Sequence, residues 1–244
     1  MPHNYNSRNA HQRDTLLHFD EEKHIYTLNG KPMISVTTLV DEYFEKFDAD
    51  YWAARKAPKL GITPEQLKAR WEENAQRARD LGTAMHDKIE KHYMGIESQS
   101  DETFDLFLQF TAHHTLHPYR TEWRIFDEEY GIAGTLDFLE YSDGIFTIYD
   151  WKRSEKLIKN GCVECDSPFH KTALPPISHI SDTTYWHYAL QVSIYRYILE
   201  KNYGINISQN RLAVFHPNNG RYHLIDLPYL RNEVVTIFKH YNGK

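Results

Sequence analysis

The chain has 244 residues, 41% of them hydrophobic and 14% aromatic, so it can bury a sizeable core, most simply as one domain with N-terminal additions. No run reaches the roughly 18 consecutive apolar residues of a membrane span, and the polar residues 1–13 lack a signal-peptide core. From these two absences we expect a soluble, intracellular chain with no membrane partner. The presence of only two cysteines fits a reducing compartment and a protein that is not secreted.

The net charge of −6 is distributed unevenly along the chain. Residues 97–150 hold twelve Asp and Glu against two Lys and Arg, so the remainder of the chain is net positive. The acidic stretch is expected to bind cations, and basic side chains of the preceding helical region could track phosphates: Lys56, Lys59, Lys68, Arg70, Arg77 and Arg79. For each of these six, a solvated helix face of mixed charge is an equally good interpretation.

The N-terminal region is expected to contain a hairpin followed by helices. Residues 25–28 and 33–37 read as two strands joined through Asn29-Gly30, a favoured hairpin turn. Helical periodicity then covers residues 41–56 and 64–94, and the second helix is expected to break near Gly82.

Strand patterns dominate the middle of the chain, and helices and strands alternate after it. The expected strands are 121–129, 132–140, 145–151, 211–216 and 222–227, and the expected helices are 185–202 and 230–241, with an irregular segment at 156–181. This order predicts an α/β fold with a central mixed β-sheet flanked by helices. Residues 1–78 would form an N-terminal hairpin and helical region of the same globule, and residues 79–244 its core.

Three residues on two of these strands carry the strongest chemical signal. Asp150 and Lys152 are two residues apart, so they point to the same side of their strand. Asp143-Gly144 is a hairpin signal that pairs this strand with the previous one and brings Asp137 near Asp150. Two neighbouring carboxylates repel each other unless a divalent cation neutralises them, and oxygen ligands favour Mg²⁺ or Mn²⁺. The arrangement predicts phosphodiester hydrolysis.

Two helical segments present further polar pairs. His86 and Glu90 are four residues apart on a segment whose apolar Met85 and Ile89 recur at helical spacing, so the two polar side chains share a face. Gln191 and Tyr195 have the same spacing and can present two hydrogen-bonding groups in one direction.

Taken in order, these motifs resemble the PD-(D/E)XK nuclease superfamily, and in particular its RecB-like exonuclease branch. A helix with a metal-binding His, a Gly-x-x-Asp strand, an Asp-x-Lys strand and a Gln-x-x-x-Tyr helix occur here in the family's order over residues 79–200. The branch includes a mitochondrial genome-maintenance exonuclease, CRISPR-associated nucleases and relatives in phages and large DNA viruses. Leu136 replaces the proline of the family name, a position that is not a ligand.

The resemblance implies a restriction-endonuclease-like core and a metal-dependent DNA exonuclease, a class active in DNA repair and recombination. His86, Asp137, Asp150 and the Trp151 carbonyl would bind Mg²⁺ or Mn²⁺, with Glu90 as a further candidate. Lys152 would help to activate the attacking water, and Gln191 and Tyr195 would position DNA that has a free end and a single-stranded segment. The alternatives are a structure-specific endonuclease and a catalytically inactive nucleic-acid-binding subunit.

Cysteine chemistry is not expected to contribute. CRISPR-associated relatives often hold an iron–sulfur cluster with four cysteines, whereas Cys162 and Cys165 are too few for such a site, so no cluster is expected. Cys162-Val-Glu-Cys165 with His170 and His179 could bind zinc, but the spacing is loose and two ordinary loop cysteines are the better interpretation.

Overall fold

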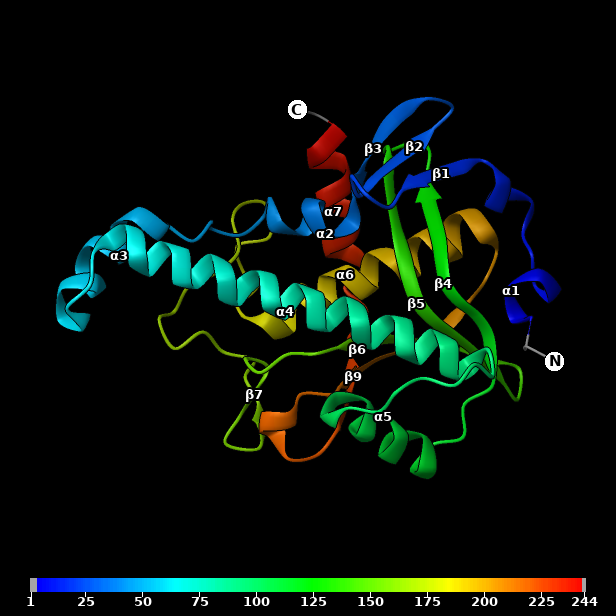
Figure 1. Ribbon diagram of the computed structural model, residues 1–244. Coiled ribbons are helices and arrows are strands. Elements are labelled where there is room, and N and C mark those ends of the chain that lie inside the picture. Colours follow the sequence, from blue (N-terminus) through cyan, green and yellow to red (C-terminus); the bar gives the residue numbers. More distant parts are fainter. Residues whose placement is uncertain (1–3, 243–244) are drawn as a thin grey trace.

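A mixed eight-stranded sheet forms the centre of the protein in the computed structural model, which describes residues 4–242 (Figure 1). The strand order is β1-β2-β3-β5-β6-β9-β10, with β4 also paired to β5; β3–β5 and β6–β9 are parallel and the other pairs antiparallel. The strands are β1 Leu17–Asp20, β2 Ile25–Leu28, β3 Lys31–Ser35, β4 Pro118–Asp127, β5 Ile132–Ser142, β6 Ile145–Lys152, β9 Ile207–Val214 and β10 His223–Leu227. The predicted α/β class with a central mixed sheet is confirmed.

Helices cover both faces of this sheet. The α-helices are α1 Tyr5–Arg8, α2 Val36–Asp41, α3 Ala49–Lys56, α4 Pro64–Tyr93, α5 Glu102–His113, α6 Thr184–Ile198 and α7 Arg231–Asn242. Shorter helical segments are η1 Gln12–Thr15, η2 Ala57–Leu60, the π-helical η3 Leu199–Tyr203 and η4 Pro217–Asn219. Within the segment expected to be irregular, β7 Ile158–Lys159 and β8 Cys162–Val163 form a small separate hairpin.

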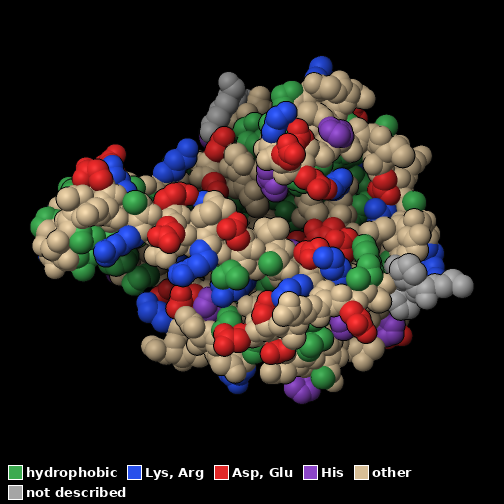
Figure 2. Space-filling view, in the orientation of Figure 1, with side chains coloured by type: hydrophobic (Ala, Val, Ile, Leu, Met, Phe, Trp, Pro, Cys, Tyr) green, Lys and Arg blue, Asp and Glu red, His purple; other side chains and the backbone are tan. Residues whose placement is uncertain are grey.

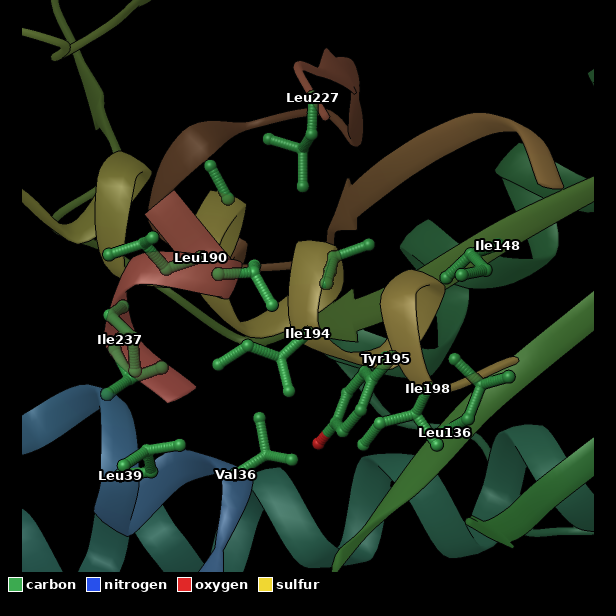
Figure 3. Packing of buried hydrophobic residues seen from close by; sticks show 14 of the residues in the cluster. Val36, Leu39, Leu136, Ile148, Leu190, Ile194, Tyr195, Ile198, Leu227 and Ile237 are labelled. Atoms are coloured by element: carbon green, nitrogen blue, oxygen red, sulfur yellow. The ribbon is translucent and has the colours of Figure 1, made fainter. Parts of the chain in front are cut away.

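The larger hydrophobic cluster lies between the sheet and helices α2, α6 and α7. Figure 3 shows Leu190 and Ile194 of α6 next to Ile237 of α7 and Val36 of α2, with Ile198 farther along the same helix. A second cluster on the other face packs α4 and α5 against alternate residues of β6, Tyr149 and Trp151. Since successive strand residues face opposite sides, Asp150 and Lys152 point toward α6, as Ile148 does.

Helix α4 is continuous, although a break near Gly82 was expected. It begins with a capping box, in which the side chain of Thr63 accepts a hydrogen bond from Gln66 N and Gln66 accepts one from Thr63 N. Its C-terminal half is anchored on the core by Met85, Ile89 and Tyr93. One interior glycine costs only about 1 kcal/mol relative to alanine, too little to interrupt a helix held in this way. The boundary expected after residue 78 lies inside this helix.

The N-terminal half of α4 projects from the body of the protein together with α3 (Figure 1). Two of the basic side chains expected to track phosphates are paired with carboxylates here, Lys68 with Asp50 at 2.7 Å and Arg79 with Glu72 at 2.6 Å. Blue and red side chains accordingly alternate along this projection in Figure 2. The mixed-charge interpretation describes these two residues.

Two N-terminal predictions were wrong in their boundaries. The strand expected to reach residue 37 ends at Ser35, whose side chain caps α2 by accepting a hydrogen bond from Thr38 N at 3.0 Å. The helix expected over 41–56 begins only at Ala49: α2 ends at Asp41, Phe44 is buried in the core between the two helices, and Asp48 caps α3 through Tyr51 N at 2.9 Å. Among residues 4–242, none of the helices is both long and apolar enough to cross a membrane.

Candidate active site

The β5–β6 hairpin brings Asp137 and Asp150 together, as the sequence predicted. Asp143 and Gly144 form its turn with φ values of 53° and 80°, and Phe138 pairs with Tyr149. Asp137 precedes Phe138 and Asp150 follows Tyr149, so the two aspartates lie next to this pair on adjacent strands. The Oδ2 atom of Asp137 accepts a hydrogen bond from the Trp151 backbone N–H at 2.7 Å, which ties the carboxylate of one strand to the backbone of the other.

Lys152 binds the second carboxylate. Its Nζ lies 2.5 Å from Asp150 Oδ2 and 5.1 Å from the centre of the Tyr188 ring. Burial, then the charge of Asp137, raises the pKa of Asp150 to about 6, against the lowering effect of Lys152. Burial alone would lower the pKa of Lys152, but the carboxylates of Asp150 and Asp137 raise it above its usual value. Lys152 is therefore an ammonium at neutral pH.

His86 reaches the site from helix α4. Its Nδ1 lies 3.4 Å from Glu122 Oε1 and 3.6 Å from Asp137 Oδ1. Burial would lower the pKa of His86, but Asp137 and Glu122 outweigh it and raise the pKa to about 9. The buried neighbours Met85 and Ile89 fix this face of the helix against the core, which places His86 over the end of the hairpin.

Glu122, rather than Glu90, is the carboxylate beside His86. It lies on β4 between Thr121, which pairs with Phe138, and Trp123, which pairs with Leu136, so it faces Asp137. Its φ of 44° is unusual for a strand residue and marks a local departure from regular β geometry. Its place in the site depends on the register of β4 against β5, which sequence patterns do not specify.

The donor set fits a hard divalent cation. Within residues 4–242, one group of His, Cys, Asp and Glu has ligand atoms within 4.8 Å of one another, and it comprises His86, Glu122 and Asp137. Asp150 lies outside that group on the next strand, and Glu90 also lies outside it. Carboxylate oxygens with one imidazole suit Mg²⁺ or Mn²⁺. Burial and the charge of Glu122 raise the pKa of Asp137, although His86, Lys152 and the hydrogen bond from the Trp151 backbone N–H lower it, and a bound cation would favour the ionised carboxylate. The Trp151 carbonyl stays a prediction of the resemblance.

Gln191 and Tyr195 line the site from helix α6, one turn apart as expected. Gln191 Nε2 donates to Asp150 Oδ1 at 3.4 Å and to the Tyr195 hydroxyl at 3.1 Å. Both side chains are buried. The amide of Gln191 therefore holds a carboxylate in place, a role additional to the predicted positioning of DNA.

A cavity of about 340 Å³ opens onto this cluster. His86, Glu122 and Tyr195 line it beside the β1–β2 hairpin, and Figure 2 shows a hollow in this face with acidic side chains gathered beside it. A second cavity, of about 250 Å³, shares Thr37 with the first and reaches Gln191. Open space thus reaches both His86 and Gln191.

The two cysteines lie elsewhere, near the small β7–β8 hairpin. Cys162 is exposed and Cys165 half-buried, and both are free thiols. The Cys165 carbonyl accepts a hydrogen bond from Trp186 Nε1 at 2.9 Å, and His179 pairs with Glu233 at 3.0 Å.

Comparison with known proteins identifies no family for this chain. The sequence matches no model of a protein family, and no curated protein matches it. Among solved structures, the crystal structure of SSO0001 aligns with 86% of this chain and 75% of its own, at 14% identity and a TM-score of 0.34.

Proposed function

We propose that this protein is a metal-dependent nuclease of the PD-(D/E)XK type, RecB-like in its motif order, that hydrolyses DNA from a strand end. One observation carries the proposal: Asp137, Asp150 and Lys152 converge on two paired strands beside His86 and Glu122. Buried carboxylates are costly unless they are paired or bind a metal. The cluster holds three carboxylates but only two basic side chains, Lys152 and His86. A divalent cation would balance the remaining negative charge.

His86, Glu122 and Asp137, with Asp150 beside them, would hold Mg²⁺ or Mn²⁺. The cation would lower the pKa of a bound water and offset negative charge on the phosphate. Lys152 remains protonated because of its two carboxylate neighbours, so it would donate hydrogen bonds to the water or to a phosphate oxygen rather than accept a proton. Gln191 would keep Asp150 oriented through its amide.

The choice between an exonuclease and an endonuclease depends on how DNA reaches the site. An exonuclease must admit a strand end, whereas a structure-specific endonuclease cuts within a strand using the same groups. A cavity of about 340 Å³ beside the cluster is small enough to favour recognition of one strand at its end. The inactive nucleic-acid-binding subunit is disfavoured because every predicted catalytic side chain is present, Lys152 pairs with Asp150, and Asp137 accepts a hydrogen bond from the backbone of Trp151, which lies between them.

A nuclease assay with Mg²⁺ or Mn²⁺ tests the proposal. Linear single- and double-stranded DNA, labelled at the 5′ or the 3′ end, is compared with closed circular DNA of the same sequence. The wild type should degrade linear DNA and spare circles. Asp150→Asn and Lys152→Ala should each lose at least about 100-fold in rate. Asp143→Asn is the matched control, because Asp143 is an exposed aspartate in the turn of the same hairpin.

Three results would count against the proposal or refine it. Absence of metal-dependent cleavage by the wild type would favour the inactive subunit. Equal loss in Asp143→Asn and Asp150→Asn would show that the effect is structural. Efficient cutting of circles would replace the exonuclease with the endonuclease.

A further inference from the structure

The cavity beside the acidic cluster has a wall of aromatic rings that the catalytic groups do not use. Phe19, His24 and Tyr26, from the β1–β2 hairpin, line the same cavity as His86 and Glu122. Phe19 stacks on Tyr26 with ring centres 4.4 Å apart, and Tyr26 is buried, with its hydroxyl 2.8 Å from Thr135 Oγ1. These two rings form the fixed part of the wall.

His24 is the ring that remains available to a ligand. It stands edge-on to Phe19 at 5.0 Å and an angle of 81°, and it is exposed. Phe19 is already covered by Tyr26 on one side and has the Arg124 guanidinium 5.0 Å from its ring centre. The ring most open to a flat partner is therefore His24.

The opposite wall contains a glycine that the fold does not require. Gly82 and Thr83 of α4 line the cavity, and a Cβ built at Gly82 would meet nothing within 4 Å. Glycine in a helix interior is less favourable than alanine, and no positive φ or close packing explains it here. Gly82 lies one turn before His86 on the same helix face, so its missing side chain widens the cavity beside the metal-binding candidates.

We propose that this cavity is a subsite for one unpaired nucleotide of the substrate strand, with its base against His24 and its sugar–phosphate passing over Gly82. The inference rests on the proposed nuclease function and specifies its substrate as a strand with an unpaired end. A volume of about 340 Å³ is at the small end of ligand pockets, which hold roughly 300–1,000 Å³. A base inside a duplex has both faces covered by its neighbours, whereas an unpaired base can stack on a side chain.

Binding measurements without cleavage test this subsite. An internally labelled single-stranded oligonucleotide, the same oligonucleotide with abasic residues at either end, and a blunt duplex are titrated in Ca²⁺ and followed by fluorescence anisotropy. The wild type should bind the intact single strand most tightly. His24→Ala should weaken that binding about five- to tenfold, the lower part of the range for one base–aromatic stack, and should leave binding of the abasic strand unchanged.

Variants at Gly82 test the opposite wall. Gly82→Ala and Gly82→Leu should weaken binding of the intact and abasic strands in order of side-chain size. Both substitutions improve helix propensity, so melting temperatures at or above that of the wild type would exclude misfolding as the cause. The matched controls are His18→Ala, an exposed histidine next to Phe19 on the opposite side of β1, and Ala84→Leu, an exposed residue of α4 outside the cavity lining.

The outcomes separate this inference from the proposed function. If the wild type neither binds nor cleaves DNA, the nuclease proposal fails and the subsite fails with it. If the wild type cleaves DNA but His24→Ala and Gly82→Leu bind every probe as the controls do, the subsite alone is refuted. Equal losses for intact and abasic strands in His24→Ala, or equal wild-type affinity for the blunt duplex, would also refute it.

Discussion

Gly134 and Tyr195 lie so close together that any side chain at position 134 would force the tyrosine ring or the strand to move. A Cβ built on Gly134 would lie 2.7 Å from Tyr195 Cε1 and 3.1 Å from Val36 Cγ2. Gly134 begins the Gly-x-x-Asp motif on β5, and Tyr195 ends the Gln-x-x-x-Tyr motif on α6. The glycine thus lets the tyrosine ring lie against the strand, where its hydroxyl meets Gln191.

Gly134→Ala should destabilise the protein by about 1–3 kcal/mol, the usual cost of overpacking a filled core. Urea denaturation gives the value. In a Tyr195→Ala background the same substitution should cost less, because the space is then free, and this double-mutant cycle measures the coupling. An unchanged cost in that background would mean that Tyr195 is not the obstacle.

Gln191→Ala should reduce kcat about 10- to 100-fold, the effect seen when a residue orienting a metal-site ligand is removed. The reason is that the Gln191 amide holds Asp150 and contacts Tyr195. Steady-state kinetics with a linear DNA substrate separates kcat from KM. Ser193→Ala is the control on the same helix. The Ser193 hydroxyl donates to Pro228 O and accepts from Leu230 N, away from the site, so its loss should lower stability and leave kcat unchanged.

Glu122→Gln should raise the Mn²⁺ concentration needed for half-maximal binding at least about 10-fold. Glu90→Gln, on the helix that carries His86, should leave it unchanged, because only Glu122 belongs to the group within 4.8 Å. Calorimetric titration of Mn²⁺ into each variant measures the difference without relying on activity. If Glu90→Gln weakened Mn²⁺ binding and Glu122→Gln did not, Glu90 would again be a candidate ligand and Glu122 would not.

Asp14→Asn should destabilise the protein by about 1–2 kcal/mol near neutral pH. Asp14 accepts hydrogen bonds from Arg120 and Trp123, each at 2.8 Å, and joins the N-terminal segment to β4. Burial raises the pKa of Asp14, but hydrogen bonds from Arg120, the His11 backbone and Trp123 lower it overall. A lowered folded-state pKa stabilises the protein above the unfolded-state pKa of about 3.9, and this stabilisation is lost as the pH falls through the folded-state value.

Denaturation curves from pH 7 to pH 3 check that expectation. The stability difference between wild type and Asp14→Asn should shrink toward the acid end. Asp50→Asn serves as the control, since Asp50 pairs with Lys68 at an exposed position and such pairs contribute little. A difference between wild type and Asp14→Asn that stays constant with pH would show that shape, not charge, sets the contribution of Asp14.

The sequence predicted the elements whose signals are local and missed the relations that depend on packing. Asp143-Gly144 was enough to pair β5 with β6 and to bring Asp137 to Asp150. Glu122 joins them only through the register of β4, which residue patterns do not encode. The continuity of α4 through Gly82 likewise depends on anchoring against the core, a tertiary effect that outweighs local helix propensity.

The position of β6 between β5 and β9 also sets how the site responds to partial unfolding. Amide hydrogens of a strand paired on both sides and covered by helices exchange with solvent mainly through global opening, whereas projecting helices and edge strands open locally at lower free energy. Asp150 and Lys152 are on a strand that is paired on both sides, while His86 is on the core-anchored half of a helix whose outer half projects from the body. Mild denaturant should therefore release the outer half of α4 before His86, on its core-anchored half, or the carboxylate–lysine pair is disturbed.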